Sequence, residues 1–227
     1  QAIHFAAATV MSGQMDVVIA AGVESMSRVP MGSPTILALK AGQGHPMSPR
    51  QQDRYPGIQF SQFMGAEMIA KKYGMTREQL DQFGYESHQK AIAATKSGAF
   101  DAEITGIEIT LPDGTKEIHK IDEGIRFDVT REGMANVKIL QENGVITAAT
   151  SSQICDGAAG VMIVNERGLK ALGVEPIAAI RHMTVTGGDP VVMLEEPLFG
   201  TEKALKRSGI KIDDIDLYEV NEAFAPV

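Results

Sequence analysis

Two short apolar runs, far apart in the chain, constrain its fold more than any other feature. Val17–Ala21 and Gly160–Val164 have the composition of strands that are buried on both faces, which is typical of a parallel sheet covered by helices. Val145–Thr147 has the same character. Ahead of them, Gln1–Ser12 is rich in small residues and predicts a helix that Gly13 ends. We therefore expect an α/β sheet domain that is interrupted and later resumed.

The interruption runs from Arg28 to about Leu140 and has a different composition. Five prolines and four glycines fall between residues 28 and 57, which indicates a long irregular segment. An excursion of this length inside a compact domain usually has a function. The sequence therefore predicts a lobe inserted into the sheet domain.

Two helices are expected inside this lobe. The first covers about Ser61–Tyr73 and ends at Gly74. The second begins at Thr76, where Gln79 three residues later completes a capping box, and it ends near Gly98. A seam of small residues along the second helix predicts tight packing against another helix; these residues are Gly84, Ser87, Ala91 and Ala94.

A hairpin should follow, because Ile107–Leu111 alternates apolar and polar residues and the Pro112–Gly114 turn leads back toward Ile118. Beyond Pro176 the α/β pattern restarts. It predicts strands at Ile177–Thr184 and Ile215–Val220, with a turn at Gly187–Pro190 and a helix at about Thr201–Ser208 between them; this run has the character of a second α/β domain.

Asn221 follows the last predicted strand, and Ala223–Ala225 would form the first turn of a helix. An isolated asparagine at this position is most simply a helix N-cap. However, an amide at a strand-to-helix switch also lies where α/β sheets bind ligands, and it can donate to negative charge that develops on a substrate oxygen. Phe224, one turn later, is compatible with core packing or with a wall of the same cleft.

Composition excludes several classes of function. The net charge of -8 argues against nucleic-acid binding, although local Arg and Lys residues can still hold an anionic small ligand. The five histidines are scattered and have no metal-ligand spacing, so we expect no metal. The longest apolar stretches are too short to span a bilayer. A single cysteine fits a reducing compartment, which favours a cytoplasmic protein.

Cys155 is the only candidate thiol nucleophile. Its neighbour Asp156 should disfavour the thiolate, so we interpret Cys155 as a small, semi-buried filler rather than a catalytic residue. His182 lies inside a predicted strand and is interpreted as a satisfied histidine rather than a base. Small residues after Asp156 would let a ligand approach the backbone, and Ser152 with its neighbouring amides could contact such a ligand.

Five motifs in a fixed order make the chain resemble the thiolase family. They are Gln1-Ala2-Ile3, Ala20-Ala21-Gly22-Val23-Glu24-Ser25-Met26-Ser27, Ile146-Thr147-Ala148 with Asp156-Gly157-Ala158-Ala159, Gly188-Asp189-Pro190, and Val220-Asn221-Glu222-Ala223-Phe224-Ala225. The resemblance implies an α/β, thiolase-like αβαβα layered fold with two similar halves, incomplete at both termini. Residues 1–175 would be the remainder of the N-terminal domain, with an inserted loop domain at about 28–140, and residues 176–227 the beginning of the C-terminal domain.

The resemblance also implies an activity: acyl transfer on coenzyme A thioesters through a cysteine acyl-enzyme. The family's nucleophilic cysteine would precede Gln1 and its catalytic histidine would follow Val227, so the chain alone is expected to be inactive. Asn221 would hold a water in the oxyanion hole. The positions that match coenzyme A contacts, with the coenzyme acting as a substrate and no other cofactor needed, are Ala148, Ser152, Met193 and Phe224. Family members are homodimers or homotetramers.

Two other functions are compatible with these residues. A decarboxylating ketoacyl synthase shares the fold, but it usually has a histidine at the position of Asn221 and lacks the long proline-rich insertion. A non-catalytic module that binds coenzyme A or lipid is the alternative from another class. Binding without thioester cleavage would distinguish that module from an enzyme.

Overall fold

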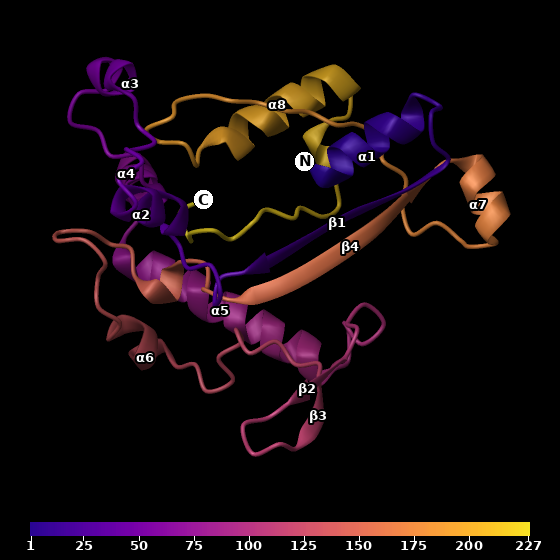
Figure 1. The fold of residues 1–227 in the computed structure, drawn as a ribbon, viewed down its shortest axis with the longest axis horizontal. Helices are drawn as coiled ribbons and strands as arrows, with labels where there is room; N and C mark the ends of the chain where they lie inside the picture. The colour runs from indigo at the N-terminus through magenta and orange to yellow at the C-terminus, as the bar shows by residue number, and fades with distance from the viewer. The chain divides into compact units, whose positions relative to one another are not determined.

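The computed structural model describes residues 1–227 and divides into two compact units. Unit 1 comprises residues 1–60 and 154–220, and unit 2 comprises residues 61–153 and 221–227. Figure 1 labels their helices and strands. Residues 28–60 thus belong to unit 1 and residues 61–140 to unit 2. The domain boundaries inferred from the resemblance stay a prediction.

Unit 1 is built on a two-stranded antiparallel ribbon of β1 (Val17–Ser25) and β4 (Asp156–Val164). The register runs from Val17 opposite Val164 to Ser25 opposite Asp156. Helix α1 (Ala2–Met11) packs on this ribbon, burying Ala6, Ala7 and Val10 (Figure 1). The remaining helices of the unit are α2 (Ser33–Lys40), α3 (Pro49–Arg54), α7 (Glu166–Leu172), α8 (Glu196–Ser208) and the short η2 (Ile212–Asp214).

Both ends of the ribbon are fixed by an aspartate. Asp156 Oδ1 accepts from the backbone N–H of Ser27 at 2.9 Å, and its Oδ2 accepts from the hydroxyls of Ser25 and Ser27 at 3.2 and 2.5 Å. The Ser27 hydroxyl, followed by the Ser27 amide, lowers the pKa of the Asp156 carboxyl. At the other end, Asp16 accepts from Asn165 and Arg167, each at 2.7 Å. The carboxylates therefore tie the two strands together where the ladder ends.

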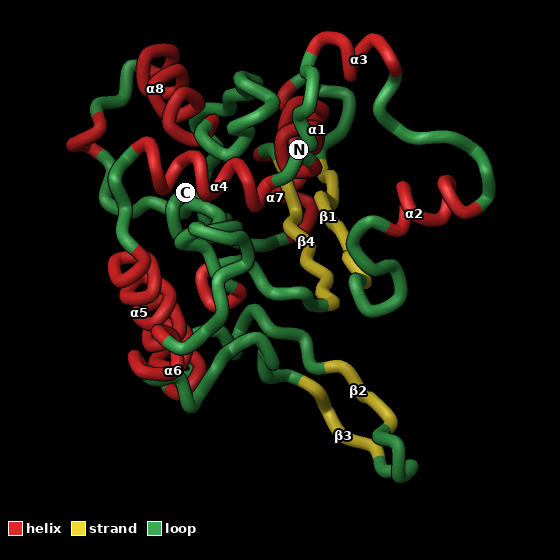
Figure 2. Tube along the Cα trace, turned by 90° about the vertical axis from the view of Figure 1, so that its left-hand side faces the viewer, coloured by secondary structure: helices red, strands yellow, loops and turns green.

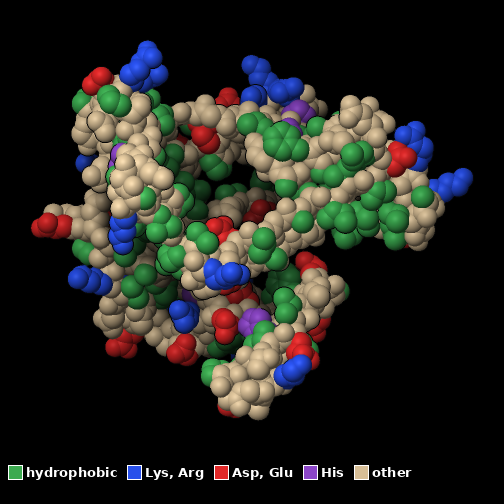
Figure 3. Space-filling model, in the orientation of Figure 1, with side chains coloured by type: hydrophobic (Ala, Val, Ile, Leu, Met, Phe, Trp, Pro, Cys, Tyr) green, Lys and Arg blue, Asp and Glu red, His purple; other side chains and the backbone are tan.

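The expected sheet is only partly present. The strands at 17–21 and 160–164 are confirmed, but the prediction of a parallel sheet buried on both faces was wrong, because β1 and β4 pair antiparallel and expose Ile19 and Val23. Figure 3 shows several patches of hydrophobic side chains at the surface. The predicted strands Ile177–Thr184 and Ile215–Val220 were also wrong: both segments lack a ladder partner, and Ile177 is fully exposed. Without cross-strand hydrogen bonds, β propensity alone does not make a strand.

Unit 2 contains the long helices α4 (Gln62–Lys72) and α5 (Arg77–Lys96), with short α6 (Arg131–Ala135) beside α5 (Figure 2). The 3₁₀ turn η1 (Ala148–Thr150) also packs against α5. The packing seam predicted on α5 is confirmed at Gly84, where an added Cβ would lie 2.7 Å from Met134 and 2.8 Å from the Ala149 carbonyl. The buried apolar residues of the unit are Ala66, Ile69, Ala70, Leu80, Ile92, Met134, Ile146 and Phe224.

The predicted hairpin is confirmed as β2 (Ile107–Thr110) and β3 (Lys116–His119), which Figure 2 shows as an antiparallel pair. Gly114 occupies the turn with a φ of 86°, which favours glycine. The strand predicted at Val145–Thr147 was wrong. It forms one isolated bridge, between Thr147 and Ile139, because the Glu67 carboxylate takes the N–H groups of Val145 and Ile146 that a ladder would use.

The C-terminal residues depart from the expected helix. Asn221 is not an N-cap, because residues 223–225 pair with the segment after η1 instead of coiling. Ser152 N–H donates to the Ala223 carbonyl at 2.8 Å, and Ala225 N–H donates to the Thr150 carbonyl at 2.9 Å. A helix would need those same backbone groups for itself.

The capping box of α5 allows a test of how much this N-cap contributes to stability. Gln79 N–H donates to Thr76 Oγ1 at 3.3 Å, and Thr76 N–H donates to Gln79 Oε1 at 2.8 Å. We expect Thr76→Ala to lower the free energy of unfolding by about 1 kcal/mol, measured by urea denaturation, because an N–H of the first turn loses its acceptor. Thr105→Ala, at an exposed position without a side-chain hydrogen bond, should change it by less than about 0.5 kcal/mol. Equal losses in the two variants would contradict the role of the cap.

Candidate functional site

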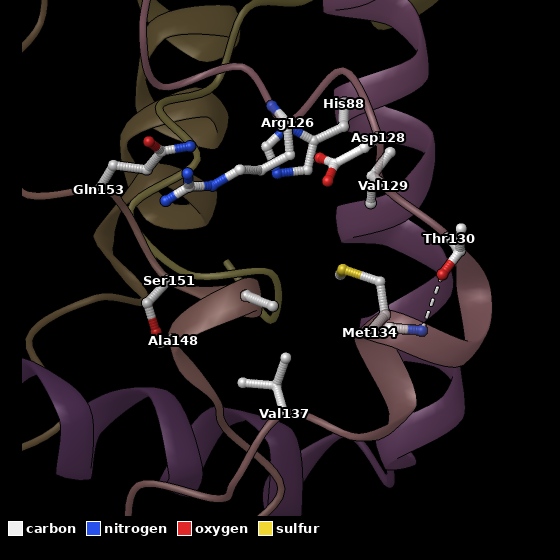
Figure 4. Close-up of a pocket in the computed structure, with 12 residues that line it drawn as sticks. His88, Arg126, Asp128, Val129, Thr130, Met134, Val137, Ala148, Ser151 and Gln153 are labelled. Atoms are coloured by element: carbon white, nitrogen blue, oxygen red, sulfur yellow. Dashed lines mark hydrogen bonds between the residues drawn. The ribbon is translucent and has the colours of Figure 1, made fainter.

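A pocket of about 500 Å³ lies within unit 2, and its lining comes from α5, α6, η1 and the irregular segments before α6, after α6 and after η1 (Figure 4). Its volume suits a small-molecule ligand or part of a larger one. The lining residues are His88, Arg126, Asp128, Val129, Thr130, Gly133, Met134, Val137, Ala148, Ala149, Ser151 and Gln153.

Charged and polar side chains gather on one side of this pocket. Figure 4 shows Arg126 extended toward Gln153, with His88 and Asp128 beside it. The Gln153 amide donates to the Gly124 carbonyl, which ties the segment after η1 to the loop that carries Arg126. The Arg126 guanidinium makes no hydrogen bond within the chain, so its donors are available to an anionic group.

His88 is held as a neutral ring. The backbone N–H of Arg126 donates to His88 Nδ1 at 3.3 Å, so this nitrogen acts as an acceptor. Burial lowers the pKa of His88 below its ordinary value of 6.5, and the positive charge of Arg126 lowers that pKa further, while the Glu222 carboxylate raises it. At a pH above this lowered pKa, His88 is uncharged, so Arg126 has no second positive charge beside it in the pocket.

The opposite side of the pocket is apolar. It is formed by Met134 and Val137 around α6 and by Ala148 in η1 (Figure 4). Ala149, the next residue of η1, also lines the pocket. Thr130 caps α6 by accepting from the Gly133 N–H at 2.9 Å. An anion-binding group facing a small apolar wall suits a ligand that has a charged end and an uncharged chain.

Three of the residues predicted to bind the ligand lie in unit 2. Ala148 lines the pocket directly. Ser152 is exposed, and its hydroxyl donates to the Glu222 carbonyl at 3.3 Å. Phe224 is buried and packs edge-on against Phe63 with ring centroids 5.2 Å apart, so its side chain belongs to the core of the unit.

Asn221 has an exposed side chain that makes no hydrogen bond within the chain. Its neighbour Glu222 accepts from the Ser87 hydroxyl at 2.6 Å, which anchors this segment on α5 next to His88. Met193 lies in unit 1, where it is half-buried and has a φ of 47°. The roles assigned to Asn221 and Met193 stay predictions.

The two candidates that the sequence analysis set aside lie in unit 1. Cys155 is an exposed free thiol, which corrects the expectation that it is semi-buried. His182 is half-buried, and its Nε2 is buried without a hydrogen-bond partner, so it is not the satisfied histidine that we expected. None of the His, Cys, Asp and Glu side chains form a cluster of three that could hold a metal ion, and no helix combines the length and the hydrophobicity needed to cross a membrane.

Family models match nearly the whole chain. The model described as "Thiolase, N-terminal domain" matches residues 1–167, and "Thiolase, C-terminal domain" matches residues 174–227. The chain belongs to the thiolase family.

Individual thiolases are similar in sequence to the chain over nearly its whole length. The chain is 41% identical to the steroid 3-ketoacyl-CoA thiolase FadA6 of Mycobacterium tuberculosis, over 100% of the chain and 55% of that protein. It is 42% identical to a 3-ketoacyl-CoA thiolase of Marinobacter nauticus, over 99% of the chain and 55% of that protein. The chain thus spans about half the length of the relatives it matches.

Solved thiolase structures share the fold. Human mitochondrial 3-ketoacyl-CoA thiolase aligns with a TM-score of 0.83 at 31% identity, covering 100% of this chain and 58% of that one. Acetyl-CoA acetyltransferase of Syntrophomonas wolfei aligns with a TM-score of 0.79 at 32% identity, covering 99% and 57%. The predicted α/β thiolase fold is therefore confirmed, although this chain forms fewer strands than expected.

The thiolase motifs did not reveal Arg126, His88 or Gln153. Arg126 and Gln153 lie in irregular segments without a periodic pattern, and His88 is one polar residue among several on α5. The one local signal was Thr130, an N-cap that places a helix start close after Arg126. Only the folded chain brings these residues around one pocket.

The electrostatics of His88 can be tested by NMR titration of its ring protons. We expect Arg126→Gln to raise the pKa of His88, because a neighbouring positive charge is removed, and Glu222→Gln to lower it further. Because the folded pKa lies below 6.5, His88 contributes stability above that pH and loses it as the pH falls through the folded pKa. The other four histidines are internal controls, and shifts of the same sign in both variants would contradict this arrangement.

Proposed function

We propose that the whole protein transfers acyl groups on coenzyme A thioesters and that the pocket of unit 2 holds part of the coenzyme. The observation that carries this proposal is that the Arg126 guanidinium and an apolar wall at Ala148 line the same pocket, in a chain of the thiolase family. Coenzyme A has the matching chemistry, because it joins phosphate groups to an uncharged pantetheine chain. Arg126 would contact a phosphate, and Ala148 with Ser152 would lie along the pantetheine.

The names of the relatives favour the degradative direction. Several of them are 3-ketoacyl-CoA thiolases, so we infer thiolytic cleavage of a 3-ketoacyl-CoA as the reaction of the whole protein. In this reaction a cysteine sulfur attacks the 3-keto carbon, the Cα–Cβ bond breaks, and acetyl-CoA leaves after its α carbon is protonated. The thiol of free coenzyme A then takes the acyl group from the cysteine, which regains its proton, so one difficult step is divided into two. Coenzyme A is a substrate here, and no further cofactor is proposed.

Cys155 is not proposed as the acyl acceptor. Its sulfur is exposed in unit 1, and Cys155 is not among the residues that line the pocket. Asn221 is the one catalytic residue proposed in this chain: its free amide would help to bind the negative charge on the thioester oxygen. The cytoplasmic location and a homodimeric or homotetrameric state stay predictions.

Calorimetric titration of the chain with coenzyme A tests the pocket. We expect Arg126→Met to weaken binding by about 10- to 100-fold, since a charge-assisted hydrogen bond contributes about 1.5–3 kcal/mol. Pantetheine, which has no phosphate groups and no adenosine, should bind equally to both forms. Arg181→Met, at an exposed position of unit 1 without an ion pair, is the matched control. Unchanged affinity in Arg126→Met would remove Arg126 from the site.

The role of Asn221 is tested in the whole protein by the thioester cleavage assay. We expect Asn221→Ala to lower kcat by about 10²-fold with little change in thermal stability, because removing an oxyanion donor from other enzymes has this cost. Gln43→Ala, at an exposed position of unit 1 whose side chain makes no hydrogen bond, controls for the loss of an amide. A kcat equal to that of the unsubstituted enzyme would exclude Asn221 from the chemical step.

A further inference from the structure

The pocket is walled by backbone segments that make few regular hydrogen bonds of their own. One wall is the end of α6 and the residues after it, where Met134 and Val137 line the pocket. The other wall is the approach to η1, where Ala148 and Ala149 line it. Backbone groups that are buried without a partner are costly, so each wall needs donors or acceptors from elsewhere.

Arg77, the first residue of α5, supplies donors to the first wall. Its Nη2 donates to the carbonyls of Met134, Ala135 and Val137 at 3.0, 3.3 and 2.9 Å. Its Nε donates to Asp81 Oδ2 at 2.7 Å, which fixes the plane of the guanidinium. One nitrogen, Nη2, serves the three carbonyls while Nε holds Asp81, so these contacts need two separate donor atoms, which a guanidinium provides.

Glu67, in the middle of α4, supplies acceptors to the second wall. Its carboxylate accepts from the N–H of Val145 at 3.0 Å through both oxygens, and from the N–H of Ile146 at 2.9 Å. A Cβ at position 144 would collide with this carboxylate, so Gly144 leaves the space that Glu67 occupies. Hydrogen bonds to an ionised carboxylate are about twice as strong as neutral ones.

The two walls are also joined to each other. Leu140 N–H donates to the Ile146 carbonyl at 2.9 Å, and Ile139 forms the isolated bridge with Thr147. Ile146 and Thr147 are almost completely buried, at 1% and 0% exposed. Arg77 and Glu67 therefore hold opposite ends of one continuous strip of backbone, and neither side chain lines the pocket itself.

We infer that Glu67 and Arg77 are positioning residues of this pocket: they set the separation of its walls and thereby its affinity for coenzyme A. The inference rests on the proposed function for the identity of the ligand. Both residues affect binding without contacting the ligand, because they act through the backbone at 134–137 and 145–149.

The experiment combines amide hydrogen exchange with titration by coenzyme A on the same proteins. Glu67→Gln keeps one carbonyl acceptor and Glu67→Leu keeps none, so exchange at Val145 and Ile146 should quicken in that order. Arg77→Lys keeps the charge but has one nitrogen, which cannot hold Asp81 and the three carbonyls together, so exchange should quicken at residues that follow α6. In Glu67→Leu and Arg77→Lys we expect coenzyme A to bind about 10-fold more weakly, while the amides of α4 and α5 keep their protection.

Controls separate this inference from a general loss of stability. Glu103→Gln removes an exposed carboxylate of unit 2 that makes no hydrogen bond, and it should leave both exchange and affinity unchanged. Quicker exchange throughout α4 and α5 in Glu67→Gln and Arg77→Lys would overturn the inference, since it would show that the residues support the whole unit.

The two proposals fail in different ways. If the unsubstituted chain does not bind coenzyme A, the assignment of this pocket to coenzyme A is refuted, while exchange that quickens only in the two walls still shows that Glu67 and Arg77 hold them in place. If the unsubstituted chain binds and Glu67→Leu and Arg77→Lys bind equally well, the positioning role is refuted and the proposed function stands.

Discussion

The pocket of unit 2 depends on one constraint: irregular backbone must find hydrogen-bond partners outside helices and ladders. The segments 134–137 and 145–147 have no strand beside them, and charged side chains of α4 and α5 take the place of one. Helices α4 and α5 thus hold these two segments in place, and the segments in turn shape the pocket. A chain with the same helices and apolar residues at Glu67 and Arg77 would leave five backbone groups to other partners.

The parts of the fold that could be predicted are those with local causes. The capping box at Thr76 and Gln79 fixes the start of α5 through hydrogen bonds within four residues, and the turn at Gly114 fixes the β2–β3 hairpin in the same way. Helix α1 ends close to Gly13 for a similarly local reason, since that glycine has a φ of 78°. These features need no information from distant parts of the chain.

The parts that could not be predicted depend on distant partners. The runs at 177–184 and 215–220 have the composition of strands, but no other segment pairs with them. Val145 has strand-like neighbours, yet a carboxylate from α4 claims its N–H. The same difference separates the site residues. Ala148 could be predicted from a family motif, whereas Arg126 could be found only from the folded positions of α5 and η1. Strand pairing and the convergence of side chains on a pocket both depend on residues far apart in the sequence. The periodicity of hydrophobic residues along the chain therefore predicts neither of them.

The C-terminal residues show how a long-range contact can give a short motif its role. Asn221 lies far in sequence from the pocket, but the segment that follows it is paired with residues 150–152, and Glu222 is anchored to Ser87 on α5. The same Glu222 raises the pKa of His88, which lines the pocket. The amide is therefore carried by a segment whose backbone is hydrogen-bonded to residues 150–152 and whose Glu222 is hydrogen-bonded to α5. As a helix N-cap, Asn221 would use its side-chain oxygen on the first turn, whereas here neither the oxygen nor the N–H donors of its amide have a partner within the chain.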